Sequence, residues 1–357
     1  MSDYRISKIY SSDSYANKQI DNLLHEEGIR RDANLDYTCG MYDNDMNIIA
    51  TGSLFGNTLR CMAVSHKHQG EGLMNEIVTH LLEVQFERGN THLFLYTKCS
   101  TSKFFGDLGF YEVARVSGQL VFMENRKNGF TDYINHLLKD YDNFDSVNKA
   151  IESPKTAAIV MNANPFTNGH LYLVEKAAKE NDILHLFMVS EDASLIPYAV
   201  RKQLILDATA HLPNICYHDS GPYMISNSTF PSYFQKDETS VITGHALLDL
   251  TIFSSIANAL HITRRYVGDE PTSQVTGIYN TVMADKLPKA DIECIIVPRK
   301  EIGEKPISAS TVRQAIHDGD IDAIKPLVPN TTYQFLKSDK AENLLQKIRM
   351  TEDVIHY

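Results

Sequence analysis

The stretch TAAIVMNANPFTNGHLYLVEKAAKEN, residues 156–181, decides the fold class. It begins with a short continuous apolar run, turns through Asn-Pro-Phe and continues into a segment with a helical pattern. Short apolar strands followed by helices are typical of a parallel sheet covered on both faces. Ligands bind to such sheets outside the carboxyl ends of the strands, so residues 167–170 stand where a site is expected.

The same alternation continues along the C-terminal half and predicts an α/β fold. Strands are expected in residues 183–190, 214–221, 264–269 and 293–299, and helices in residues 199–212 and 247–262. The stretch TSVITG, residues 239–244, is expected as a separate element before the second of these helices.

The N-terminal part has a different order of elements. Residues 47–64 look like two strands joined by Gly-Asn, and residues 72–89 have a helical period that ends at Gly89. A strand in residues 92–97 and a helix, turn and strand in residues 102–116 follow. We therefore predict an α/β domain with a mixed sheet in residues 1–125, a helical connection in residues 126–153 and a second domain in residues 154–350.

Composition and charge narrow the function. With 43% hydrophobic and 22% charged residues the chain is typical of a globular protein, and its net charge of -11 argues against binding to nucleic acid. No secretory signal and no apolar run long enough to span a membrane are expected. The five cysteines are odd in number and never in C-x-x-C spacing, which favours reduced thiols in a cytoplasmic protein over disulfides or a zinc site.

Residues 167–170 offer donors for a negatively charged group. A helix N-terminus has free N–H groups and a dipole that favours an anion. Gly169 would let a phosphate approach the backbone, and His170 can donate a hydrogen bond to a phosphoryl oxygen whether protonated or neutral. Taken alone, a Gly-His pair is more simply explained as a turn and a helix cap.

A second stretch, PISASTVRQAI, residues 306–316, places hydroxyl groups at another predicted helix start. Ser308, Ser310 and Thr311 lead into this helix, and Arg313 lies in its first turn. Such hydroxyls are commonly helix caps. In combination with residues 167–170, however, the hydroxyls, N–H groups and guanidinium suit a triphosphate.

These two stretches resemble the signatures of the nucleotidyltransferase superfamily. TNGH is similar to its T/H-x-G-H motif, and ISASTVR, residues 307–313, is similar to its I-S-S-T-x-x-R motif. In that superfamily both motifs bind the triphosphate of a nucleotide and stabilise attack on its α-phosphorus. The resemblance implies a Rossmann-like parallel-sheet nucleotidyltransferase domain in the C-terminal half.

Longer blocks resemble the citrate (pro-3S)-lyase ligase family over essentially the whole chain. These blocks are residues 161–178, 223–234, 264–280, 298–316 and 327–336. The resemblance implies that acetate and ATP form acetyl-adenylate, whose acetyl group passes to a thiol on the citrate lyase acyl carrier subunit. That thiol belongs to a phosphoribosyl-dephospho-coenzyme A prosthetic group, and AMP and pyrophosphate are released.

The resemblance also implies roles for individual residues. His170, Thr167 and Arg313 are expected to act on the phosphates, and Mg²⁺ is expected to bridge phosphate oxygens without a protein cage of its own. The remaining nucleotide- or acyl-binding residues are expected to be Asn162, Phe166, Gly169, Arg265, Ser308, Ser310 and Thr311. Asp269 and Glu270 could contribute to metal contacts, whereas Arg201 and Lys202 are expected to be a surface pair.

This chain departs from the family pattern at three positions. Thr272 and Ser273 occupy places where an aromatic residue and a cysteine are expected, and Ser228 stands where alanine is usual. These departures concern the expected contacts with the acceptor.

The N-terminal stretch HKHQGEGLMNEIV, residues 66–78, resembles the pyrophosphate-binding loop of the GNAT acyltransferase superfamily. Gln69, Gly70 and Gly72 would then hold the diphosphate of a coenzyme A-like arm at a helix start. Lys67 departs from the first position of that pattern, and Phe105 stands where many GNAT enzymes have a tyrosine general acid. The resemblance therefore favours binding of the carrier's prosthetic arm over independent acetyl transfer.

Two alternatives share part of this pattern. Another nucleotidyltransferase of the phosphopantetheine or nicotinate type would have both phosphate motifs but would not explain the N-terminal domain. An N-acetyltransferase whose C-terminal domain senses nucleotide would use the N-terminal loop but does not fit Phe105. The acyl specificity, the oligomeric state and the metal ligands are left open by the sequence.

Overall fold

The computed structural model describes residues 4–148, 151–192, 194–224, 230, 238–269, 274–303 and 305–354. The chain folds into two compact units, one of Met1–Phe130 with Phe230–Thr251 and one of Thr131–Thr229 with Ile252–Tyr357. The first division falls within the predicted connection, residues 126–153. The return of Phe230–Thr251 to the first unit has no counterpart in the predicted domains.

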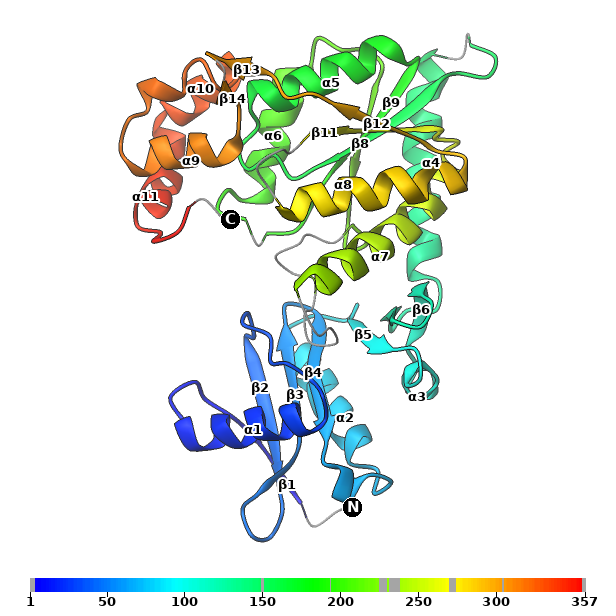
Figure 1. Ribbon diagram of the computed structural model, residues 1–357, viewed down its shortest axis with the longest axis vertical. Helices are drawn as coiled ribbons and strands as arrows, with labels where there is room; N and C mark the ends of the chain where they lie inside the picture. The colour runs from blue at the N-terminus through cyan, green and yellow to red at the C-terminus, as the bar shows by residue number, and fades with distance from the viewer. Residues whose placement is uncertain are drawn as a thin grey trace. The chain divides into compact units, whose positions relative to one another are not determined.

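The first unit contains a seven-stranded mixed sheet in the order β1-β2-β3-β4-β5-β7-β6 (Figure 1). Its strands are β1 (Arg5–Lys8), β2 (Tyr37–Tyr42), β3 (Ile48–Phe55), β4 (Thr58–Val64), β5 (Phe94–Lys98), β6 (Tyr111–Val116) and β7 (Leu120–Glu124), and its first helices are α1 (Ser14–Glu26), α2 (Leu73–Glu87) and α3 (Ser102–Asp107). Among its described strands the parallel pair is β4 with β5, over two residue pairs, and the other neighbours are antiparallel. The prediction of a mixed sheet is confirmed.

Local sequence explains the elements around the predicted loop of this unit. Gly56, with φ of +55°, forms the tight turn between β3 and β4. Helix α2 buries Leu73, Ile77 and Leu81 against the sheet, at the spacing of one helical face. It ends just before Gly89, whose φ of +80° suits the residue after a helix. The predicted hairpin and helix are both confirmed.

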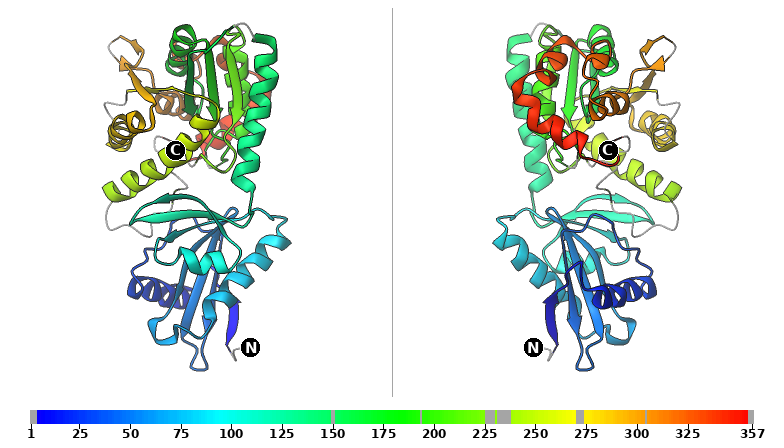
Figure 2. Two further views of the ribbon diagram at one scale, coloured as in Figure 1. Left: turned by 90° about the vertical axis from the view of Figure 1, so that its right-hand side faces the viewer. Right: turned by 90° about the vertical axis from the view of Figure 1, so that its left-hand side faces the viewer.

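The second unit is built on a five-stranded parallel sheet in the order β10-β9-β8-β11-β12. Its strands are β8 (Thr156–Met161), β9 (Ile183–Met188), β10 (Ile215–Asp219), β11 (Arg264–Gly268) and β12 (Glu293–Val297). The accompanying helices are α4 (Gly129–Asn148), α5 (Asn168–Glu180), α6 (Tyr198–Thr209) and α8 (Gln274–Lys286), and α7 (Glu238–Ala259) belongs to the first unit up to Thr251 and to the second from Ile252. Helices lie on both faces of the sheet, with α4 beside β9 and β10 (Figures 1 and 2). The predicted parallel α/β fold is confirmed.

The remaining elements form the C-terminal end of the chain. They are the short strands β13 (Glu301–Ile302) and β14 (Lys305–Pro306), the helices α9 (Ala309–His317), α10 (Asn330–Leu336) and α11 (Glu342–Arg349), and 3₁₀ turns at Asp322–Ile324 and Asp339–Ala341. Two further 3₁₀ turns lie earlier in the chain, His66–His68 before α2 and Leu287–Ala290 after α8. Val312, Ile316, Leu336 and Ile348 pack together and hold the three helices as a small cluster.

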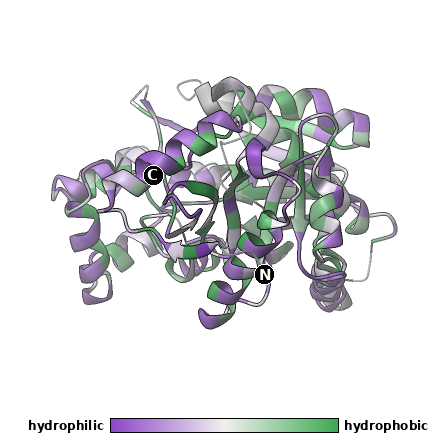
Figure 3. Ribbon diagram, turned by 90° about the horizontal axis from the view of Figure 1, so that it is seen from below, coloured by the Kyte–Doolittle hydropathy of each residue, from purple (hydrophilic) through white to green (hydrophobic). Residues whose placement is uncertain are grey.

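The central strands are apolar because both faces of the sheet are covered. Leu184, Leu186 and Met188 of β9 pack with residues of α5 and α6 such as Val174 and Leu204. In Figure 3 the strands are mostly green, the apolar colour, whereas the helices carry purple hydrophilic residues. Continuous apolar strands of this kind are expected in a buried parallel sheet.

Two predictions about residues 239–259 are wrong: that TSVITG is a separate element, and that no apolar run is long enough to span a membrane. TSVITG is not a separate element, because Thr239–Gly244 continue directly into the rest of α7. The window Thr239–Ala259 has a mean hydropathy of 1.4 and is long and apolar enough, by length and composition, to cross a membrane. However, 61% of this window is buried within the structure, as in a core helix.

Candidate active site

The predicted site lies where the parallel sheet reverses its order. From β8 the chain adds β9 and β10 on one side and β11 and β12 on the other. Such a switch point leaves an open crevice at the carboxyl ends of the two central strands, here β8 and β11. The segment Thr167–His170 directly follows the loop after β8, so it lies at this crevice.

Thr167 and His170 form a reciprocal cap at the start of α5. The Thr167 hydroxyl accepts the backbone N–H of His170 at 3.3 Å, and His170 Nδ1 accepts the backbone N–H of Thr167 at 3.0 Å. The imidazole thereby takes the place that Glu or Gln has in the usual capping box. The cap and the predicted site are therefore made by the same residues.

This geometry also assigns the proton of His170. A ring nitrogen that accepts a backbone N–H carries no proton, so the neutral ring has its proton on Nε2. Burial, together with the positive charge of Arg299, lowers the pKa of His170 to about 4. Near neutral pH the side chain is therefore an uncharged donor through Nε2.

The second motif forms a similar cap at the start of α9. The Ser308 hydroxyl accepts the backbone N–H of Thr311 at 3.1 Å. The same hydroxyl lies 2.8 Å from those of Ser310 and Thr311. Three hydroxyls and the free N–H groups of a helix start are thus gathered within a few ångströms, as the sequence predicts.

The two motifs, distant in sequence, are in direct contact. A Cβ atom on Gly169 would lie 3.3 Å from the carbonyl oxygen of Ile307, closer than most Cβ contacts. Arg313 Nη1 donates to the carbonyl of Asn164 at 2.6 Å. A side chain at position 169 would therefore press on the backbone of the second motif, a contact that the sequence does not reveal.

Arg313 lies inside the protein. It is 4% exposed, and its Nε donates to the carbonyl of Val354 at 2.5 Å. Burial lowers the pKa of its guanidinium to about 10, which leaves it charged near neutral pH. The structure therefore gives Arg313 a bracing role between the loop after β8 and the C-terminal segment, and its contact with phosphate stays a prediction.

Arg299 is a candidate site residue that the sequence reasoning missed. It follows the end of β12, and its charge acts on His170. Its Nε donates to the carbonyl of Asp269 at 2.9 Å, and its Nη1 lies 3.5 Å from the carbonyl of Ile307. The signal was an arginine just beyond the carboxyl end of a predicted strand, where ligands bind.

Two predicted pocket residues support the loop after β8. Phe166 is fully buried, and its ring lies against that of His170 with centroids 5.7 Å apart. The Asn162 amide donates to the Ser194 hydroxyl at 2.9 Å, and its side-chain oxygen accepts from Arg201 at 2.8 Å. Their contacts with a ligand stay predictions.

Both arginines predicted near this region lie elsewhere than expected. Arg201 is not part of a surface pair, because it is 1% exposed and donates to the carbonyls of several loop residues. Arg265 is the second residue of β11 and lies over the ring of Phe253 at 4.2 Å. It therefore lies at the amino end of β11, away from the carboxyl edge where ligands bind.

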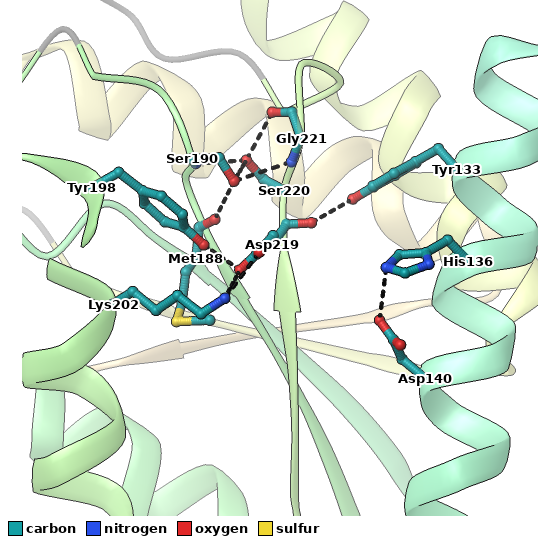
Figure 4. A network of polar contacts seen from close by, with 10 residues as sticks. All are labelled: Tyr133, His136, Asp140, Met188, Ser190, Tyr198, Lys202, Asp219, Ser220 and Gly221. Carbon is teal, nitrogen blue, oxygen red and sulfur yellow. Dashed lines mark hydrogen bonds and ion pairs between the residues drawn. The ribbon is translucent and has the colours of Figure 1, made fainter. Parts of the chain in front are cut away.

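A further polar network follows β9 and β10 (Figure 4). Tyr198 and Lys202 both donate to the Asp219 carboxylate, and the Tyr133 hydroxyl donates to its backbone carbonyl at 3.2 Å. Burial alone would raise the pKa of Asp219, but the hydrogen bonds from Lys202 and Tyr198 hold it below its usual range. Ser190 accepts the backbone N–H of Gly221 at 3.1 Å. These groups line the carboxyl edge of the sheet and were not predicted as a set.

In the first unit, the predicted loop has the backbone that its glycines allow. Gly70 and Gly72 have φ values of +92° and +82°, and Gly72 caps α2. A Cβ atom on either would meet no other atom within 4 Å, so the space beside the loop is open. Gln69 lies 3.4 Å from the Glu27 carboxylate. Phe105 is buried in the core of this unit.

Several predicted positions lie outside the described residues. They are Ser228, Glu270, Thr272 and Ser273, together with most of the block in residues 223–234. All five cysteines are described and free, in agreement with the predicted absence of disulfides.

The fold and the site together define a class of protein. A parallel α/β sheet with two capped helix N-termini in contact at its carboxyl edge is typical of enzymes that bind phosphorylated ligands. A family model described as the citrate lyase ligase C-terminal domain matches residues 156–336. The chain belongs to the citrate lyase ligase family.

Whole-chain relatives support this assignment. The citrate (pro-3S)-lyase ligase of Escherichia coli (strain K12) is 37% identical over 351 residues, which cover 96% of this chain and 95% of that protein. The ligase of the same name from Klebsiella pneumoniae is 36% identical over 322 residues, which cover 89% of this chain and 91% of that protein. The match therefore includes both units.

Solved acetyltransferases overlap with part of the chain. A GNAT-family acetyltransferase from Staphylococcus aureus Mu50 covers 34% of this chain with a TM-score of 0.29 and 15% identity. Escherichia coli ElaA covers 34% with a TM-score of 0.30 and 15% identity. The family assignment rests on the ligase matches.

Proposed function

We propose that the protein activates acetate with ATP and transfers the acetyl group to the prosthetic-group thiol of the citrate lyase acyl carrier subunit. Acetyl-adenylate is the intermediate, and AMP and pyrophosphate are the other products. The observation that carries the proposal is the contact between Gly169 and Ile307, which brings both capped helix starts to one crevice. The family assignment supplies the acyl acceptor. Five free cysteines fit a reducing compartment, and we infer a cytoplasmic location.

In the first half-reaction, an acetate oxygen attacks the α-phosphorus of ATP and pyrophosphate leaves. His170 donates through Nε2 to an oxygen of the phosphate under attack. The hydroxyls of Ser308, Ser310 and Thr311, with the N–H groups that open α9, receive the β- and γ-phosphates. Arg299 supplies positive charge near His170. Such a reaction needs positioned donors and charge neutralisation more than covalent help.

Mg²⁺ fits this site as an ion that arrives with ATP. The donors at the two motifs are hydroxyls and N–H groups. In the described part of the chain, the cluster of three side chains suited to bind a metal ion is formed by other residues, His185, Cys216 and His218. Mg²⁺ commonly binds through substrate phosphates and keeps several waters. When bound, it neutralises part of the triphosphate charge.

Isotope exchange between pyrophosphate and ATP tests the first half-reaction. We expect exchange to require acetate and Mg²⁺ and to stay at background without an acid, because the reverse reaction needs acetyl-adenylate. Propionate in place of acetate measures the acyl specificity. Exchange that is indifferent to the acid would overturn the proposal, and AMP retained within a product would point to another nucleotidyltransferase.

In the second half-reaction, the carrier thiol attacks the acetyl carbonyl and AMP leaves. We propose that the loop of Gln69, Gly70 and Gly72 binds the diphosphate of the carrier's phosphoribosyl-dephospho-coenzyme A arm. The open space beside both glycines and the helix start at Leu73 support this role.

Replacing Gly70 by Leu is expected to raise the KM for the carrier protein about tenfold, equivalent to roughly 1.4 kcal/mol of binding. Acetate-dependent exchange should be unchanged, because it does not need the carrier. Gly118→Leu is the matched control, since Gly118 also has positive φ, of +74°, and open space around it in the same unit. Equal loss of carrier acetylation and exchange in Gly70→Leu would contradict the assignment.

A further inference from the structure

Three ligand-type side chains gather on the face of the parallel sheet that α5 and α6 do not cover. In the sheet register Cys216 of β10 lies opposite His185 of β9, and His218 is two residues farther along β10. All three side chains therefore point to one face, because side chains alternate along a strand. One ligand atom from each lies within 4.8 Å of the others.

These side chains are fully buried. His185 is 0% exposed, His218 1% and Cys216 3%. The Tyr141 ring of α4 covers His185, with centroids 5.1 Å apart, and the Phe187 ring lies 4.8 Å from that of His218. Two imidazoles on an otherwise apolar face need a reason beyond packing, since histidine is costly to bury without partners.

Their hydrogen bonding is incomplete. His185 Nδ1 and His218 Nε2 are 2.8 Å apart and share one hydrogen bond. The other nitrogen of each ring has no hydrogen-bond partner within the part of the chain that the structure describes. Two neutral imidazoles joined by one bond always leave one N–H and one lone pair unmet. A buried unmet group is unfavourable, because it has lost its hydrogen bonds to water and gained no partner.

We propose that His185, His218 and Cys216 bind a borderline-soft divalent cation of the Zn²⁺ type. Two imidazole nitrogens and one thiolate are a ligand set that Zn²⁺ prefers. The two rings share one hydrogen bond, and the other nitrogen of each has no partner in the described structure, so each ring can turn a lone pair to the ion. The Cys216 thiol releases its proton to solvent as the sulfur–metal bond forms.

The required rearrangement is small. Two tetrahedral nitrogen ligands stand about 3.3 Å apart when each lies 2.0–2.1 Å from the metal. The rings therefore separate by roughly half an ångström from their hydrogen-bonded distance. Asp140, whose charge acts on Cys216, and His136 lie on the side of α4 that faces β10 (Figure 4). The acidic side chain adds the negative charge that favours a cation, and the bound ion would tie the edge strand β10 to β9.

Cobalt is the probe for this site, because a thiolate ligand gives Co²⁺ a near-ultraviolet charge-transfer band. Untagged full-length protein, stripped with a chelator, is titrated with Co²⁺ and then with Zn²⁺. We expect one equivalent of Co²⁺ to produce that band with tetrahedral visible bands, and Zn²⁺ to abolish both. Zn²⁺ should also raise the Tm, because it binds the folded state.

Cys216→Ser should lose the charge-transfer band and weaken Zn²⁺ binding by about 100-fold or more. Cys61→Ser, which removes another buried thiol, should keep both. His185→Asn provides a second variant that should weaken binding without removing the thiol. Absence of the band in the wild-type protein, or equal Zn²⁺ affinity in the wild type and Cys216→Ser, would overturn the proposal. ATP–pyrophosphate exchange is not part of this readout, so the metal site and the proposed function can fail separately.

Discussion

His170→Ala is expected to lower acetate-dependent ATP–pyrophosphate exchange by about 10²–10³-fold, the usual effect of removing one fixed donor to a charged transition state. The structure gives the reason. Nδ1 is occupied by the backbone N–H of Thr167, so the donor that remains for phosphate is Nε2. Alanine removes this donor, and steady-state exchange kinetics at saturating ATP and acetate measure the loss.

A second variant separates catalysis from capping. His170 also completes the cap of α5, so alanine is expected to cost about 1 kcal/mol of stability as well. His170→Gln keeps a side-chain oxygen that can accept the N–H of Thr167, as Gln does in the usual capping box. We expect near wild-type Tm but strongly reduced exchange in His170→Gln. Wild-type exchange in either variant would show that the imidazole is only a cap.

Arg201→Met is expected to lower the free energy of unfolding of the second unit by about 4 kcal/mol, the largest change among the variants proposed here. Arg201 donates to the backbone carbonyls of Asn162, Val189, Glu191 and Ile196 at 2.6–2.9 Å. It thereby joins the loop after β8 to the loop after β9. Hydrogen bonds from a charged donor contribute on the order of 1.5–3 kcal/mol each, and methionine would leave four carbonyls without this partner.

Lys202→Met is the matched control, one residue away on the same helix. Lys202 pairs with the half-exposed Asp219, and such surface pairs contribute about 0–1 kcal/mol. The chain has no tryptophan, so thermal unfolding is followed by circular dichroism. We expect the Tm of Arg201→Met to fall by roughly 10 °C and that of Lys202→Met to change little. Equal stability of the two variants would contradict the bracing role of Arg201.

Much of the fold followed from local patterns. The apolar runs in residues 156–161 and 183–188 became neighbouring parallel strands, and residues 73–87 became the predicted amphipathic helix. The prediction of a separate element in residues 239–244 was wrong for a physical reason. The β-branched residues of TSVITG favour a strand, but they continue into a long apolar helix whose packing outweighs that preference.

Sequence by itself determined the two capped helix starts, because each cap joins residues three positions apart, Thr167 with His170 and Ser308 with Thr311. It also determined the position of the first motif at a strand end. Such features depend on neighbours along the chain, where residue type and spacing suffice.

Only the tertiary structure decided which of these groups meet. It put Ile307 against Gly169, turned Arg313 and Arg201 inward to bind carbonyls, and brought the charge of Arg299 to His170. In the same way it collected His185, Cys216 and His218, although the cysteine spacing had argued against zinc. These contacts join different strands and loops, and their energies depend on burial and distance, which spacing along one chain does not specify.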